Sequence, residues 1–152
     1  MPLDPPGEPR VFLESDEVYW APELSPDGGF VAYATGAGIY VSTFPEGSGK
    51  WQVSTGEGCW KGFWSPAGDR LFYHQWGRLM EVEAATDPEL QFGTPRLLFD
   101  QDQEGFLPGR EVAIAEDGRS FVGVRVLKPD EDVPEVREGI HVVENWFSEF
   151  QD

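Results

Sequence analysis

Short apolar runs separated by turn residues make up most of this chain, and no helical period links them. Between Trp60 and Asp100 four such runs follow one another, at residues 63–64, 71–74, 78–82 and 96–99. Apolar runs of this length, bounded by glycine, proline and polar residues, are typical of β-strands. The stretch therefore predicts one unit of four short strands that pair through tight turns.

The turn that follows the first of these strands recurs along the chain. It reads Ser65-Pro66-Ala67-Gly68, and matching segments occur at Ser25-Pro26-Asp27-Gly28 and at Ala115-Glu116-Asp117-Gly118. Proline presets φ at the second position of a turn, and glycine adopts the left-handed conformation at the fourth. Each segment therefore predicts a hairpin, in which we expect Asp27 and Asp117 to accept hydrogen bonds from local backbone amides.

The spacing of the three turns indicates the architecture. They begin at residues 25, 65 and 115, so the intervals are 40 and 50 residues. Four-stranded propeller blades recur at about this period. A β-sandwich also has short strands at regular spacing, but it gives no reason for one turn to recur in every four-strand unit. The predicted fold class is all-β, a partial β-propeller with three four-stranded blades.

The predicted boundaries follow from these units. Residues 1–9 are rich in proline and charge and are interpreted as a flexible lead-in. Arg10–Glu14 is interpreted as a strand without a local hairpin partner, so residues 10–20 are assigned to the outer strand of a preceding blade position. The blades are assigned to residues 21–56, 57–104 and 105–152, the last with a C-terminal tail.

Within the blades, further strands and one loop are predicted. The first blade has strands near residues 23–24, 30–34, 39–42 and 51–54. In the second blade, residues 85–94 form a loop between the third and fourth strands. The third blade has strands at 111–114, 120–126 and 140–144, and no fourth strand follows.

Composition and charge narrow the classes of partner. The chain carries 28 acidic and 11 basic side chains, a net charge of −17. This charge disfavours nucleic acids and anionic membranes and favours cationic partners. Aromatic residues make up 14% of the chain, which is enough to build a core. Cys59 is the only cysteine, so no intrachain disulfide is possible. The N-terminus has no signal-peptide pattern, so we expect a cytoplasmic protein.

Catalytic and metal-binding motifs do not emerge from the sequence. There is no Gly-x-Ser-x-Gly nucleophile motif, and His74 and His141 lack the spacing of metal ligands. Both histidines are interpreted as packing or surface residues. The acidic loop at residues 130–135 is interpreted as solvated, and the sequence leaves open whether it binds a cation such as Ca²⁺. We predict no catalytic residue, no metal and no cofactor.

The residues that open the inner strands are the candidate ligand-binding residues, because these strands line the central channel of a propeller. They are Trp20, Glu23, Trp60, Lys61, Arg110 and Glu111. Aromatic rings beside charges at a channel mouth suit peptide recognition, although packing between blades is the competing interpretation of both tryptophans. The favoured function is a non-catalytic module that binds a peptide or protein. The alternative is a propeller hydrolase or lyase with carboxylates at the channel.

Several segments resemble the WD-repeat-like propellers of TolB and, more closely, the propeller modules fused to bacterial serine/threonine kinases. They lie at residues 24–28, 50–54, 64–66, 77–80, 95–99 and 142–147, within a resemblance that runs from Arg10 to Phe150. This resemblance implies a bacterial, non-catalytic interaction module. Family members carry further blades upstream of the part matched here, so the chain is alternatively a truncated fragment of a longer propeller protein.

Three blades alone would leave apolar surface exposed at both ends of an open half-ring. Two chains related by a two-fold axis would form six blades, which is within the common range for propellers. We therefore expect a homodimer in which Arg10–Glu14 pairs with residues 140–144 of the second copy. The predicted interface residues are Val11, Phe12, Leu13, Ile140, Val142, Trp146 and Phe147.

Overall fold

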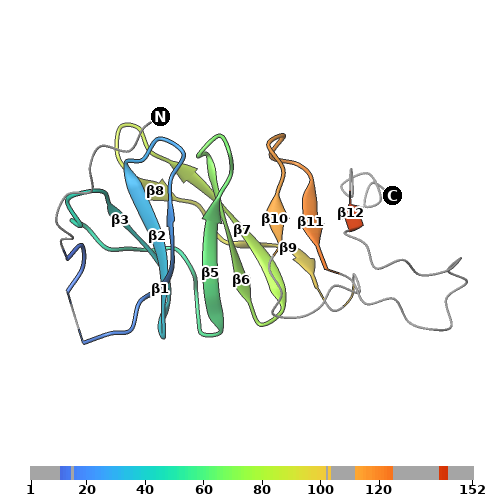
Figure 1. The fold of residues 1–152 in the computed structure, drawn as a ribbon, viewed down its shortest axis with the longest axis horizontal. Coiled ribbons are helices and arrows are strands. Elements are labelled where there is room, and N and C mark those ends of the chain that lie inside the picture. Colours follow the sequence, from blue (N-terminus) through green and yellow to red (C-terminus); the bar gives the residue numbers. More distant parts are fainter. Residues whose placement is uncertain (1–10, 15, 102, 104–111, 125–140, 144–152) are drawn as a thin grey trace, which may run out of the picture.

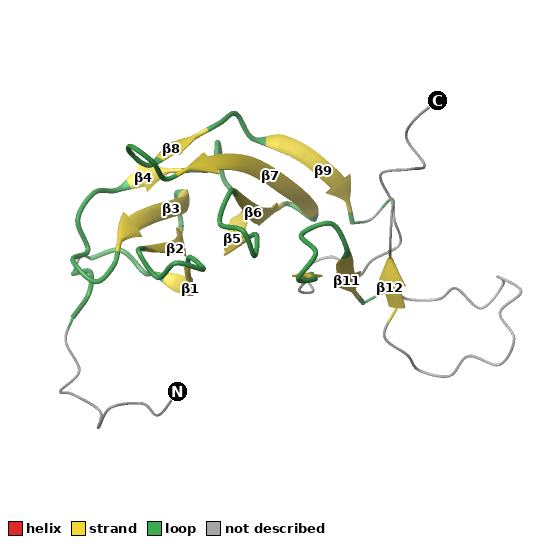
Figure 2. Ribbon diagram, turned by 90° about the horizontal axis from the view of Figure 1, so that it is seen from above, coloured by secondary structure: helices red, strands yellow, loops and turns green. Residues whose placement is uncertain are grey.

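The structure is a computed structural model that describes residues 11–14, 16–101, 103, 112–124 and 141–143. Within these residues every regular element is a β-strand, and the strands form three antiparallel sheets. Seen from above, the sheets follow one another along an arc, with β1 and β5 on its concave side and β4, β8 and β9 on its convex side (Figure 2). The predicted all-β fold, a partial propeller, is confirmed.

Blade 1 is a meander of four strands in the order in which they occur in the sequence. Its strands are β1 (Trp20–Leu24), β2 (Phe30–Thr35), β3 (Gly38–Thr43) and β4 (Trp51–Gln52). The four strands predicted for this blade are confirmed, and each differs from its predicted bounds by a few residues.

Blade 2 contains the longest described strand, β7, and one strand that the sequence did not predict. Its strands are β5 (Cys59–Trp64), β6 (Arg70–Gln75), β7 (Arg78–Ala85), β8 (Gln91–Phe92) and β9 (Arg96–Asp100). The two halves of β7 pair with different strands, β9 with the first and β8 with the second. The prediction of an unbroken loop over residues 85–94 is therefore wrong, because β7 extends far enough to pair with Gln91–Phe92.

Blade 3 follows blade 2 along the arc and lies to the right of β5 and β6 in Figure 1. Its described strands are β10 (Ala113–Ile114), β11 (Phe121–Gly123) and β12 (His141–Val143). Residues 104–111, 125–140 and 144–152 lie outside the described part of the chain, together with the predictions made for them: the acidic loop, Arg110, Glu111, Ile140, Trp146 and Phe147.

The three recurring turns form as predicted. Gly28, Gly68 and Gly118 have φ of 72°, 75° and 66°. The backbone amide of each donates a hydrogen bond to the carbonyl oxygen of the residue that opens its turn, at 2.8, 2.9 and 3.0 Å. The Asp27 carboxylate accepts a hydrogen bond from the Gly29 amide at 3.0 Å, and Asp117 accepts one from Arg119 at 2.8 Å. These carboxylates stabilise turns, as expected.

Alternation along the strands of blade 2 divides its side chains between two interfaces. On β6, Leu71 and Tyr73 belong to the core shared with blade 1, whereas Phe72 belongs to the core shared with blade 3. Successive side chains of a strand point to opposite faces, so one strand supplies both cores. Leu71 and Tyr73 are fully buried and Phe72 is 1% exposed, which is the packing expected of an inner blade.

The N-terminal residues correct one prediction. Residues 11–14 do not form a strand but lie against blade 1, where the Phe12 ring contacts the Phe44 ring at a centroid distance of 5.6 Å. Tyr19 contacts Tyr33 edge to face at 5.3 Å. Residues 11–14 and 16–19 are called the cap segment below. The apolar run Val11-Phe12-Leu13 has strand-like residue types, but it meets side chains of blade 1 instead of a strand edge.

Candidate functional site

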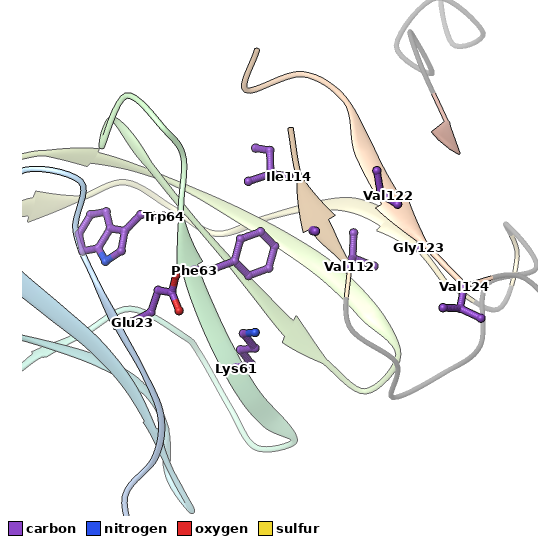
Figure 3. A pocket seen from close by; sticks show the side chains of 10 residues that line it. Glu23, Lys61, Phe63, Trp64, Val112, Ile114, Val122, Gly123 and Val124 are labelled. Atoms are coloured by element: carbon purple, nitrogen blue, oxygen red, sulfur yellow. The ribbon is translucent and has the colours of Figure 1, made fainter. Parts of the chain in front are cut away.

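A groove of about 430 Å³ lies between the inner strands of the three blades. It opens where β1, β5 and β10 approach one another on the concave side of the arc (Figure 3). The described residues that line it are Glu23, Lys61, Phe63, Trp64, Val112, Ala113, Ile114, Val122, Gly123 and Val124. The walls of the groove are β-strands, which hold their side chains in defined positions.

One side of the groove carries opposite charges on neighbouring strands. Glu23 lies on β1 and Lys61 on β5, and both side chains are labelled on the left of Figure 3. Each strand contains a one-residue bulge in its pairing, between Trp20 and Glu23 in β1 and between Cys59 and Gly62 in β5. Bulges re-aim side chains next to functional sites, and these two occur at corresponding points of both inner strands.

The rest of the groove is apolar. Phe63 and Val112 are 7% and 5% exposed, and the Phe63 ring stacks on Phe72 with a centroid distance of 5.5 Å. On the opposite side, Val124 is 53% exposed. A ligand in the groove would therefore meet buried apolar side chains at its base and charged groups at one edge, which is the usual composition of a binding site.

The structure brings two of the predicted ligand-binding residues together and places two others elsewhere. Glu23 and Lys61 both line the groove. Trp60 instead stacks on His74 at 4.7 Å, and Trp20 lines a separate cavity beside the cap segment. The competing interpretation of both tryptophans was packing between blades, but the contact of Trp60 with His74 lies within blade 2, between β5 and β6. His74 is fully buried, as the packing interpretation of this histidine requires.

Sequence reasoning missed the apolar part of the groove, although one signal was present. Phe63 lies two residues after Lys61 on β5, and alternate residues of a strand share a face. Val122 and Val124 are related in the same way along and beyond β11. Once Lys61 is assigned to the channel, alternation points to Phe63, but the approach of β11 depends on how blade 3 packs.

An ion-pair network around a buried carboxylate, Glu81, connects three strands of blade 2. Glu81 is 1% exposed, and its carboxylate accepts a hydrogen bond from Arg96 Nε at 2.7 Å and lies 3.3 Å from Arg70 Nη1. The same carboxylate raises the pKa of Arg96. The three residues come from β6, β7 and β9, so the network ties the outer strands together and has no place in the groove.

Two further findings concern the described part of the chain alone. No three histidine, cysteine, aspartate or glutamate side chains converge there in a way that would hold a metal ion. Nor is there a helix with the length and apolar character needed to cross a bilayer.

Two solved structures are similar to the chain. A protein named as a TolB candidate from Agrobacterium tumefaciens is 24% identical with a TM-score of 0.53, and the match covers 76% of this chain and 42% of that one. A protein named as a 6-phosphogluconolactonase candidate from Bacteroides uniformis is 14% identical with a TM-score of 0.49, over 74% of this chain and 35% of that one. The chain thus spans less than half the length of either structure.

No family model and no curated protein matches the sequence. At 24% identity, the similarity to the Agrobacterium structure concerns the fold alone. It agrees with the arc of antiparallel sheets described above, and the chain accordingly has a TolB-like partial β-propeller fold.

Proposed function

We propose that this chain is a non-catalytic binding module that takes a peptide or protein segment into the groove between its inner strands and associates with a second copy of itself. The observation that supports peptide binding is the composition of the groove. It combines an apolar base at Phe63 with Glu23 and Lys61 on adjacent strands.

The ligand expected for this groove is a segment with an apolar side chain next to a basic one. Phe63 and Val112 offer the apolar side chain a dry contact. Glu23 is exposed, and it forms no hydrogen bond or ion pair with another described residue. Its carboxylate is therefore available to a cationic group, and the net charge of −17 favours the approach of such a ligand.

The hydrolase or lyase alternative gains less support from the same geometry. Glycoside hydrolysis of the usual kind needs two carboxyl groups that flank the scissile bond. Among the described residues that line the groove, Glu23 is the single carboxylate. Binding is the function that these side chains favour.

Selection from a displayed peptide library tests the proposal, followed by calorimetric titration of the selected peptides. We expect apolar residues flanked by lysine or arginine to be enriched. The double variant Glu23→Gln, Lys61→Gln should weaken binding by at least about tenfold, because a single charge-assisted contact contributes about 1.5 to 3 kcal/mol and about 1.4 kcal/mol corresponds to a factor of ten. Its unfolding temperature should be unchanged, because neither side chain belongs to the two apolar cores.

The matched control is Glu89→Gln, Arg78→Gln, which removes the same two kinds of charge from blade 2 outside the groove. It should bind the selected peptides as the unmodified chain does. Neither double variant changes the net charge, so equal loss of binding in both would show that the charges of the groove have no special role, and the proposal would then be wrong.

A further inference from the structure

The face of blade 1 that points away from blade 2 has the residue pattern of an interface between blades. Ala32 and Ala34 on β2 belong to the core shared with blade 2. Val31 and Tyr33 alternate with them along the strand and therefore point the other way. In blade 2 the corresponding positions after the recurring turn are Leu71 and Tyr73, which pack on blade 1. We call the outward side of blade 1 its leading face.

The cap segment covers this face in place of a blade. Val31 and Tyr33 are only 6% and 3% exposed although no blade precedes them among the described residues. The cover is incomplete, because an apolar groove of about 230 Å³ remains. Its lining comprises Phe12, Leu13, Tyr19, Trp20, Pro22, Val31 and Tyr33.

Incomplete cover is clearest at Leu24. This residue pairs with Val31 directly before the recurring turn, as Trp64 pairs with Leu71 in blade 2. Directly paired residues share a face of the sheet, so Leu24 occupies on the leading face the place that Trp64 occupies at the interface between blades 1 and 2. Trp64 is 6% exposed, whereas Leu24 is 50% exposed.

The contacts that hold the cap segment include the Phe12–Phe44 and Tyr19–Tyr33 ring contacts and an exposed ion pair between Lys50 and Glu17 at 3.0 Å. Ring contacts contribute modestly beyond burial, and exposed ion pairs contribute little. An incoming blade would bury the same face over a larger and better packed area.

A second copy of this chain can supply that blade. Among the described residues, blade 3 is the last of the arc. Its Val122 on β11 corresponds to Phe72 on β6, because each directly follows the residue of its strand that packs toward the preceding blade, Phe121 and Leu71 respectively. Phe72 packs in the core between blade 2 and the next blade, blade 3. Joining blade 3 of one copy to blade 1 of another continues the ring, and two copies give a blade number common among propellers.

We infer that the leading face of blade 1 is the surface on which blade 3 of a second copy docks, and that the cap segment occupies this surface in the free chain. The inference rests on the self-association included in the proposed function. It replaces the exchange of residues 10–14 expected from the sequence, because residues 11–14 lie on their own blade 1. Only the fraction of chains with a displaced cap binds, so the cap weakens the apparent affinity.

Sedimentation equilibrium over a micromolar to millimolar range tests this competition. The variant Phe12→Ala, Tyr19→Ala removes both ring contacts of the cap segment and leaves the leading face intact. We expect its dimerisation constant to be tighter than that of the unmodified chain by about tenfold, because each aromatic pair is worth a few-fold in an equilibrium. Adding Leu24→Glu to this variant should return it to a monomer.

Leu97→Glu in the same background is the matched control, because Leu97 is 52% exposed on β9 of blade 2, away from the leading face. It should leave the dimer unchanged. A cap variant that keeps its near-ultraviolet circular dichroism and still sediments as a monomer would overturn the inference, as would equal effects of Leu24→Glu and Leu97→Glu. Titration with the selected peptides is independent of these results, so failure of docking and failure of the peptide groove are distinguishable.

Discussion

The two faces of blade 1 are built from the same strands but are closed in different ways. Toward blade 2, Ala32 and Val41 are fully buried against the five-stranded sheet of that blade. On the leading face, Tyr33 and Tyr40 stack on each other at 6.2 Å, and Tyr19 of the irregular cap segment contacts Tyr33. The comparison shows that the alternating pattern specifies two faces to be buried but does not specify what buries each of them.

The largest expected difference between the two faces concerns corresponding residues before the recurring turn. Trp64→Ala should lower the free energy of unfolding by about 3 to 5 kcal/mol, because it leaves a cavity in the core between blades 1 and 2. Leu24→Ala should cost under about 1 kcal/mol, since half of its surface is exposed in the folded chain. Urea denaturation followed by tryptophan fluorescence and circular dichroism measures both.

Equal decreases in the free energy of unfolding from Trp64→Ala and Leu24→Ala would mean that the leading face is packed as tightly as the interface between the blades. Leu97→Ala serves as the control for a substitution of an exposed leucine, because Leu97 is 52% exposed on the outer strand β9. Its loss should match that of Leu24→Ala.

A smaller effect is expected at high pH, where the dry interface between blades 1 and 2 has an ionisable group. Burial, followed by the nearby Cys59, raises the pKa of Tyr73 to about 12. The folded state thus disfavours the tyrosinate relative to the unfolded chain, in which the pKa of a tyrosine is about 10. The stabilising contribution is complete below pH 10 and is lost as the pH rises toward 12, a loss of about 2 kcal/mol.

Tyr73→Phe should abolish this alkaline loss of stability, which urea denaturation at a series of pH values would detect. Tyr33→Phe is the matched control on the leading face, because it removes a corresponding hydroxyl and leaves Tyr73 in place. An unchanged pH dependence in Tyr73→Phe would show that another group causes the alkaline loss.

Local patterns predicted most of the blades because hairpins depend on short-range chemistry. The recurring turns required only proline and glycine at fixed positions, and the strands of blade 2 required only alternation around Leu71–Tyr73. The strand β8 was missed because two residues carry no period, and Gln91–Phe92 pair only because β7 continues to Ala85. The cap segment was misassigned for a related reason, since Val11–Leu13 has strand-like residues whose contacts are set by tertiary structure.

The groove was predictable to the extent that it follows from position in a blade. Glu23 and Lys61 were found because the sequence assigned them to the starts of inner strands, although in the structure Glu23 is the fourth of five residues in β1 and Lys61 the third of six in β5. Trp60 was included for the same reason, but its ring stacks on His74, and this contact depends on the register between β5 and β6. The approach of β10 and β11 to Phe63 depends on the packing of blade 3 on blade 2, which no local pattern encodes.

The smallest expected effect tests how firmly the leading face is closed. Lys50 donates a hydrogen bond to Glu17 of the cap segment at 3.0 Å and lies 4.5 Å above the Tyr40 ring, while both charged side chains are nearly half exposed. The bond to Glu17 raises the pKa of Lys50. Lys50→Gln should therefore cost about 0.5 kcal/mol at low ionic strength, and less at high salt, where exposed charges are screened.

Arg78→Gln is the control in this last case, because it breaks a similar pair with Asp100, at 3.5 Å, within blade 2. Hydrogen exchange of the Tyr33 and Tyr40 amides should then increase in Lys50→Gln but not in Arg78→Gln, since only the first substitution loosens the cap segment. If Lys50→Gln lowered the free energy of unfolding as much as Trp64→Ala, the cap segment would be an integral part of the core. The two faces of blade 1 would then contribute equally to stability.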